Sequence, residues 1–121
     1  MEPAIAEARY LRTFTDPDGV TRGDNTAPPF EAGNLPGSPA LEMTAAWPSS
    51  SSFLIRCEPG WYWDWHPSPR RQIALTIEGS VEVGTSDGAA NRLGPGSIWL
   101  HEDLAGRGTI RASSVIRRGS R

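Results

Sequence analysis

The feature that most limits the fold of this chain is a set of short segments in which apolar and polar residues alternate, each closed by a turn. In residues 71–78, isoleucine and leucine alternate with polar or small residues. This two-residue period is that of a β-strand, whose successive side chains point to opposite faces. Gly79-Ser80 then makes a tight turn, so residues 71–84 are predicted to form a β-hairpin. No window shows the apolar stripe of an amphipathic helix, and the sequence therefore predicts an all-β fold.

Turn residues are frequent along the rest of the chain, which contains 13 glycines and 11 prolines. They divide it into further short predicted strands at residues 9–14, 41–47, 53–57, 61–66, 97–101, 109–111 and 115–117. Residues 23–40 are predicted to be a loop, and Cys57 is predicted to be a buried structural thiol. Many short strands separated by turns are typical of a β-sandwich or barrel.

Composition excludes several kinds of function. The net charge is −2, which favours neither nucleic acid nor an anionic membrane as a partner. No run approaches the roughly 20 apolar residues of a membrane-spanning helix, and the N-terminus lacks the features of a signal peptide, so a cytoplasmic location is predicted. Cys57 is the single cysteine, which excludes a cysteine-based zinc site, and the absence of lysine excludes Schiff-base chemistry.

Four residues in the middle of the chain follow a known spacing. Gly60, His66, Gln72 and Gly79 match the pattern G-x5-H-x-H-x(3–4)-E-x6-G, and Gly96 suits the glycine that opens a second motif. Through these residues the chain resembles a small single-domain cupin. The resemblance implies a double-stranded β-helix, a jelly-roll-like barrel over residues 41–118. Residues 1–40 would then be a strand and loop packed on the barrel, and residues 119–121 a disordered tail.

The metal-binding motifs of that family are degenerate in this chain. Ser68 stands where the family has its second histidine, Gln72 where it has glutamate, and the position near Thr109 has lost its histidine. His66 is the one family ligand retained. Amide and hydroxyl groups are weak ligands for transition metals, so no cofactor is expected.

A divalent metal remains the alternative, with His66, Gln72 and His101 as its ligands. A site with two histidines lacks the third strong ligand usual for catalytic zinc. Glu102 or Asp103 could supply it, but adjacent residues in a strand point to opposite faces, so at most one of them faces the cavity.

Strand alternation predicts which side chains line a cavity. If His66 faces inward, Tyr62 and Asp64 face inward too unless a bulge intervenes. Trp61, Trp63 and Trp65 then share the opposite face, where they form either core or interface or, alternatively, a wall for an aromatic ligand. The same reasoning adds further cavity residues, namely Gln72, Thr76, Trp99 and His101.

Two roles are predicted for charged groups near that cavity. Asp64 lies beside His66 and would orient its imidazole and raise its pKa for acid–base work. The alternative is a solvent-facing pair. Arg70 could bind a substrate carboxylate at the barrel mouth, or be a solvated strand entry.

The resulting functional hypothesis is a small-molecule enzyme of cupin fold that works without redox metal chemistry. It would be a cyclase, isomerase or dehydratase for an oxygenated hydrophobic metabolite, with His66 and Asp64 catalytic and Tyr62, Gln72 and Thr76 holding the substrate. A homodimer is expected from the resemblance and from the apolar outer faces of the strands. A metal-dependent cupin, dioxygenase-like or hydrolytic, and a non-catalytic ligand-binding cupin stay open as alternatives.

Overall fold

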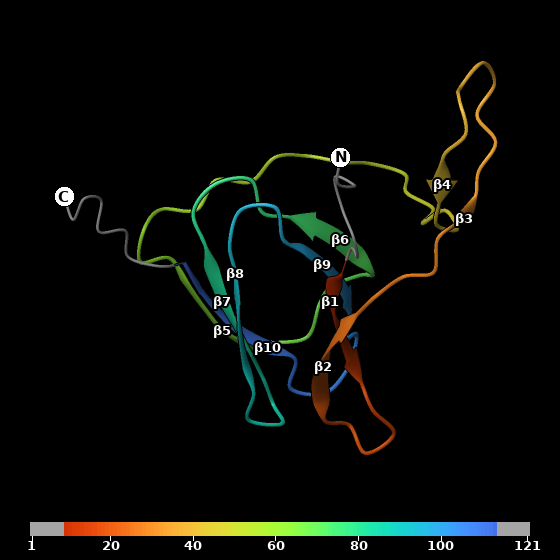
Figure 1. Ribbon diagram of the computed structural model, residues 1–121. Coiled ribbons are helices and arrows are strands. Elements are labelled where there is room, and N and C mark those ends of the chain that lie inside the picture. The colour runs from red at the N-terminus through yellow and green to blue at the C-terminus, as the bar shows by residue number, and fades with distance from the viewer. Residues whose placement is uncertain (1–8, 114–121) are drawn as a thin grey trace.

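The computed structural model describes residues 9–113, which form ten strands and no helix (Figure 1). The all-β class predicted from the sequence is confirmed. The predicted strand at 115–117 and the tail at 119–121 lie outside the described residues. No helix in the described part of the chain is long and apolar enough to cross a membrane.

The strands are β1 (Tyr10–Thr15), β2 (Thr21–Thr26), β3 (Glu31–Ala32), β4 (Glu42–Met43), β5 (Tyr62–His66), β6 (Gln72–Leu75), β7 (Val81–Thr85), β8 (Ala90–Leu93), β9 (Ile98–Glu102) and β10 (Thr109–Ser113).

Eight of these strands form two four-stranded sheets. The β1 sheet has the order β2-β1-β9-β6, and the β10 sheet has the order β5-β10-β7-β8. Strands β1 and β9 run parallel, whereas the other pairs within both sheets are antiparallel. Strands β3 and β4 make a small ribbon that projects away from both sheets (Figure 1). Among the described residues neither sheet closes into a barrel, so the architecture is two separate packed sheets.

A small apolar core joins the two sheets. Leu11 and Trp99 enter it from the β1 sheet, and Val83 and Leu93 enter it from the β10 sheet. Gly23 in β2 borders this core, since a Cβ at this position would lie 3.3 Å from the Leu11 side chain of its own sheet and 3.5 Å from Asn91 of the other.

Much of the buried interior is polar. Among the described residues the buried polar side chains are Thr13, Thr21, Ser68, Thr85, His101, Asp103, Thr109 and Arg111, compared with only five buried hydrophobic ones. A polar group removed from water costs free energy unless it finds a hydrogen-bond partner. An interior of this kind is a costly way to build a core, so its polar side chains are candidates for a functional role.

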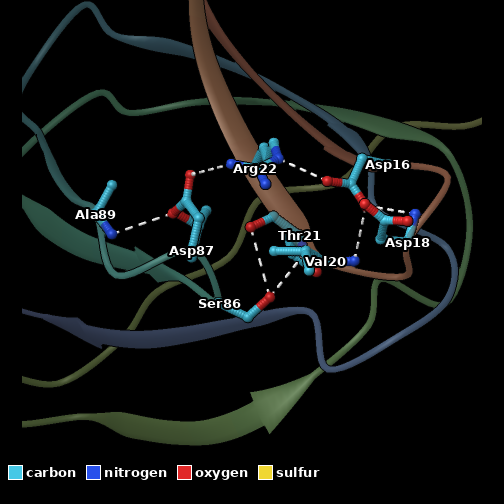
Figure 2. Close-up of polar contacts among 9 residues, drawn as sticks. Asp16, Asp18, Val20, Thr21, Arg22, Ser86, Asp87 and Ala89 are labelled. Carbon is cyan, nitrogen blue, oxygen red and sulfur yellow. Dashed lines mark hydrogen bonds and ion pairs between the residues drawn. The ribbon is translucent and has the colours of Figure 1, made fainter.

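The turn predicted at Asp16–Gly19 joins β1 to β2 and is held by one carboxylate (Figure 2). Asp16 Oδ1 accepts hydrogen bonds from the backbone N–H groups of Asp18 and Val20, at 2.8 and 3.0 Å. Arg22 Nε donates to Asp16 Oδ2 at 2.6 Å. The hydrogen bond from Arg22 is the largest cause that holds the pKa of Asp16 below its ordinary value.

The first residues of β2, which follow this turn, contact the β7–β8 turn, so the two sheets are tied together at this end (Figure 2). Ser86 Oγ accepts from the Thr21 N–H at 2.7 Å, and Arg22 Nη1 lies 3.8 Å from Asp87 Oδ2. The Thr85 hydroxyl donates to Asp87 Oδ1 at 2.6 Å and is the main cause of the lowered pKa of Asp87.

Residues 23–57 differ from the prediction. The expected loop at 23–40 contains the end of β2 and all of β3, while the expected strand at 41–47 is reduced to the two residues of β4. The expected strand at 53–57 does not form, and Cys57 is exposed instead of buried. Apolar residues make a strand only when another strand pairs with them, and the described residues offer this segment no partner.

Candidate functional site

A β-bulge in β5 decides which side chains of that strand face the interior. His66 pairs with Thr109 of β10, and Trp63 pairs with Arg111, so three steps along β5 match two steps along β10. The extra residue reverses the alternation between Trp63 and His66. Their rings consequently stack, with centroids 3.7 Å apart and planes 17° apart. The prediction that the three tryptophans lie opposite His66 is therefore wrong for Trp63.

The bulge also separates His66 from the two residues predicted to share its face. Tyr62 and Asp64 are both exposed, and the Tyr62 hydroxyl donates to Asp64 Oδ1 at 3.3 Å. The other bond to Asp64 Oδ1 comes from the Trp65 N–H, at 2.8 Å. The carboxylate of Asp64 thus lies away from the imidazole, and the shared face predicted for Tyr62, Asp64 and His66 is wrong.

The backbone of Asp64, instead of its carboxylate, orients the imidazole of His66. His66 Nδ1 lies 2.7 Å from the Asp64 carbonyl oxygen. A carbonyl can only accept, so the neutral ring carries its proton on Nδ1. Nε2 is then a free lone pair, and it is buried without a partner in the described structure. This arrangement makes Nε2 of His66 a base.

Gly108 helps to hold His66 in this place. It precedes β10, and its φ of 78° is in the left-handed region that favours glycine. A Cβ at this position would overlap the backbone carbonyl of His66. The Gly108 N–H donates to Thr21 Oγ1 at 2.9 Å, which fixes the loop against the β1 sheet.

His101 in β9 is the second imidazole of the interior, and its proton lies on the other ring nitrogen. Gln72 Nε2, from the neighbouring strand β6, is 3.3 Å from His101 Nδ1. An amide nitrogen can only donate, so Nδ1 accepts and we assign the proton to Nε2. Ser68 Oγ lies 3.4 Å from the same Nδ1. Nε2 of His101 is buried and has no partner in the described structure.

Burial keeps this second imidazole neutral. Loss of solvent lowers the pKa of His101 to about 3, with smaller contributions from the charges of Arg111 and His66. At pH 7 His101 is therefore a neutral N–H donor, the state in which an imidazole can polarise a carbonyl without giving up its proton.

Arg111 of β10 lies between the two histidines. Its guanidinium carbon is 5.4 Å from the ring centroid of Trp63 and 4.7 Å from that of Trp99. Trp99 in turn stacks on His101 with ring centroids 3.7 Å apart. We call the five side chains the central stack, in the order His66, Trp63, Arg111, Trp99 and His101.

Arg111 is a buried charge that lacks a complete set of partners. It is 7% exposed, and its Nε donates to Thr109 Oγ1 at 2.9 Å. Burial lowers its pKa, while the negative charge of Asp103 opposes that change. Nη2 is buried and has no hydrogen-bond partner in the described structure. A buried donor without a partner is a candidate for contact with a ligand.

Asp103 follows β9 and is fully buried. Trp99 Nε1 donates to Thr13 Oγ1 at 2.9 Å, and the Thr13 hydroxyl donates to Asp103 Oδ1 at 2.7 Å. Asp103 Oδ2 has no partner in the described structure. Glu102 faces the other way and pairs with Arg12 and Arg71. The prediction that only one of the two acids faces the interior is confirmed.

The remaining predicted site residues fall into two groups. Gln72, Trp99 and His101 come together in the interior, and His66 is close enough to His101 for their charges to interact. Arg70 is exposed and meets Ser68 through its backbone carbonyl. Thr76 is half-buried, and its backbone bonds Gly96 and Ser97. The roles predicted for all these residues stay predictions.

Sequence reasoning missed Arg111, Trp63, Thr13 and Asp103 as a group. Arg111 could have been found, because it lies two residues after Thr109 in the same predicted strand and so shares its face. Trp63 carried no such signal, since the bulge that brings its ring onto His66 depends on the pairing with β10.

The donors present do not fit the divalent metal that the cupin resemblance suggests. Among the described residues, no three His, Cys, Asp or Glu side chains gather as a group that could hold a metal ion. The proton assigned to His101 Nε2 occupies the lone pair that a ligand would need, and the Arg111 cation beside the rings would repel a metal.

A cleft of about 220 Å³ opens between the sheets where β1, β8 and β9 meet. Two of its lining residues, Leu11 and Leu93, also belong to the apolar core that Trp99 joins. The cleft therefore borders the apolar core, although none of the five side chains of the central stack lines it. Its lining residues are Arg9, Tyr10, Leu11, Asn25, Asn91, Arg92, Leu93, Ser97 and Ile98.

Comparisons with protein-family models, curated proteins and solved structures found no match to this chain.

Proposed function

We propose that the interior between the two sheets binds a small carbonyl compound and catalyses a non-redox proton transfer on it. The supporting observation is that four buried polar atoms of the interior lack partners in the described structure: His66 Nε2, His101 Nε2, Asp103 Oδ2 and Arg111 Nη2. Native interiors rarely leave such atoms unmatched, and a ligand that satisfies them recovers the cost.

The four atoms differ in chemical character, and this suggests roles. His66 Nε2 is a lone pair and would remove a proton from the carbon next to the substrate carbonyl. His101 Nε2–H and Arg111 Nη2–H are donors and would stabilise the oxygen on which negative charge develops. Trp99 is buried, and Trp63 holds the ring of His66 on one face although 46% of it is exposed, so both would position the site groups instead of stacking on the ligand.

An enolate formed in this way has three simple outcomes. Return of the proton from His66 to a different carbon is an isomerisation. Expulsion of a β-hydroxyl, protonated to water by His66, is a dehydration. Attack of the enolate carbon on a second carbonyl is a cyclisation. The proposal therefore keeps the isomerase, dehydratase and cyclase classes and replaces the Asp64 carboxylate with the Asp64 carbonyl as the group that orients His66.

The cupin jelly roll, the homodimer and the cytoplasmic location belong to the same proposal and stay predictions. The exposed outer side chains of β6, Ile73 and Leu75, are consistent with a second copy packing there.

Solvent-deuterium exchange into a small ketone tests the proton transfer without knowledge of the natural substrate. Acetone in D₂O would be followed by proton NMR with the wild-type protein, His66→Gln and the exposed control Glu78→Gln. We expect the wild type and the control to exceed free imidazole at equal concentration, and His66→Gln to lose about 100-fold or more of that acceleration. Asp64→Asn should retain most of it.

Equal exchange by the wild type and His66→Gln would remove the catalytic proposal. Binding of the ketone without exchange would identify a ligand-binding protein instead of an enzyme. The tautomers can be checked on the same samples by ¹⁵N NMR, which should show the proton on Nδ1 of His66 and on Nε2 of His101.

A further inference from the structure

Among the described residues, Asp103 Oδ2 is the one buried acceptor without a partner that does not belong to an imidazole. Its Oδ1 is held by the Thr13 hydroxyl at 2.7 Å, whereas Oδ2 is buried and has no partner in the described structure. A fully buried carboxylate oxygen needs a donor. The proposed proton transfer does not use this atom, so its presence calls for a separate explanation.

Arg111 is a cationic donor near Asp103, but no described hydrogen bond or ion pair joins the two. The two residues feel each other's charge. Among the described ion pairs, however, none joins Arg111 to Asp103, and Arg111 Nη2 is itself without a partner. The same interior thus contains a cationic donor, Arg111 Nη2, and an anionic acceptor, Asp103 Oδ2, that have no partner among the described residues.

The charges of this interior favour a ligand without net charge. The guanidinium of Arg111 and the carboxylate of Asp103 compensate each other, and His101 is neutral. An added carboxylate would leave one buried negative charge uncompensated, which is costly. A neutral ligand with one acceptor and one donor matches both open atoms at no such cost.

We infer that the ligand carries a hydroxyl group beside its carbonyl, and that Asp103 Oδ2 accepts the hydrogen bond of this hydroxyl. The inference rests on the proposed function for the carbonyl end of the ligand, which Arg111 and His101 hold. The substrate class is then a neutral α-hydroxy ketone or aldehyde, and Asp103 is the residue that selects it over the compound without the hydroxyl.

The reaction that this implies is an isomerisation within a single substrate molecule. His66 Nε2 removes the proton from the carbon that bears the hydroxyl, and the electron pair moves onto the carbonyl oxygen to give an enediolate. The hydroxyl proton then passes from its own oxygen to the former carbonyl oxygen, and His66 Nε2 returns the first proton to the former carbonyl carbon. The carbonyl and hydroxyl groups exchange places, and no oxidant or second reactant is required.

A binding comparison on the full chain tests this inference. Hydroxyacetone and acetone would be titrated by ligand-observed NMR against the wild type, Asp103→Asn and Glu102→Gln. Glu102 is the matched control, because it is the neighbouring acid and points to the outer ion pairs with Arg12 and Arg71. A hydrogen bond to a charged group is worth about tenfold or more in affinity.

We expect hydroxyacetone to bind the wild type and Glu102→Gln about tenfold more tightly than acetone, and the two probes to bind Asp103→Asn almost equally. Equal affinities in the wild type, or no binding of hydroxyacetone, would overturn the inference. If Asp103→Asn does not fold, the ratio of the hydroxyacetone affinity to the acetone affinity in the wild type alone decides the outcome. A preference for hydroxyacetone without His66-dependent exchange rejects only the catalytic proposal, whereas His66-dependent exchange without the preference rejects only the role of Asp103.

Discussion

Strands β5 and β6 are both edge strands, one in each sheet, and each helps to place one of the two histidines. In β6 the alternation is regular. Gln72 points inward to His101, while Ile73 and Leu75 point outward and are 40% and 64% exposed. In β5 a single extra residue reverses the pattern, so that Trp63 and His66 face the same side. The difference shows how a one-residue irregularity can assemble a site that regular alternation would have divided.

One-residue deletions offer the strongest way to break this comparison. Deletion of Ala74 from β6 would turn part of that strand over and bring an outward side chain inside, so we expect a loss of roughly 4 kcal/mol or more in unfolding free energy. Deletion of Asp64 from β5 would instead remove the bulge and leave Trp63 and His66 two residues apart on one face. Its expected cost is about 1–2 kcal/mol.

Urea denaturation of both deletion variants measures this difference. The Asp64 deletion should also lose the bond from His66 Nδ1 to the Asp64 carbonyl, so ketone exchange should fall even though the protein folds. Equal destabilisation by the two deletions would contradict the assignment of the bulge to β5.

Gly108, in the loop before β10, tests how closely the backbone must approach His66 at the end of β5. We expect Gly108→Ala to lower the unfolding free energy by about 3 kcal/mol, because the residue has a positive φ and its Cβ would overlap the His66 carbonyl. Gly88→Ala is the matched control. Its φ is also positive, at 92°, but a Cβ there would meet nothing, so a cost of only about 1 kcal/mol is expected.

Thermal or urea unfolding of the two alanine variants gives both values. If the two substitutions cost the same, backbone conformation alone matters and the close approach to His66 contributes nothing measurable.

The histidine held by β6 should make stability depend on pH. In the unfolded chain His101 takes up a proton below its ordinary pKa of 6.5, whereas the folded protein does so only near pH 3. The unfolded state then binds more protons, so stability decreases as the pH falls through this window. Between pH 6.5 and 4.5 the expected loss is about 2.5 kcal/mol.

Urea midpoints at the two pH values test this loss, with His101→Gln as the comparison. The variant should show a much flatter dependence, since it removes the titrating group. A wild-type curve as flat as that of the variant would mean that the ring is charged in the folded protein.

Local patterns predicted those parts of the fold that depend only on neighbouring residues. The two-residue period of residues 72–77 correctly predicted that Gln72 faces inward. The composition of residues 16–19 correctly predicted a turn there. The strand expected at 53–57 was wrong: Phe53, Leu54 and Ile55 are 69%, 89% and 74% exposed. That segment has suitable composition, but strand formation needs a partner, and a partner is a property of the whole fold.

The sequence by itself determined the all-β class and the presence of two histidines with few conventional metal ligands around them. The hairpin predicted for residues 71–84 is wrong, because β6 pairs with β9 whereas β7 pairs with β8 and β10 in the other sheet. Only the tertiary structure decided that His66 is a base and His101 a donor, because each tautomer depends on the one partner that meets Nδ1. It also decided that Arg111 and Asp103, eight residues apart, are buried together without pairing. Such outcomes depend on strand register and on contacts between distant segments, and a local pattern of residue types specifies neither.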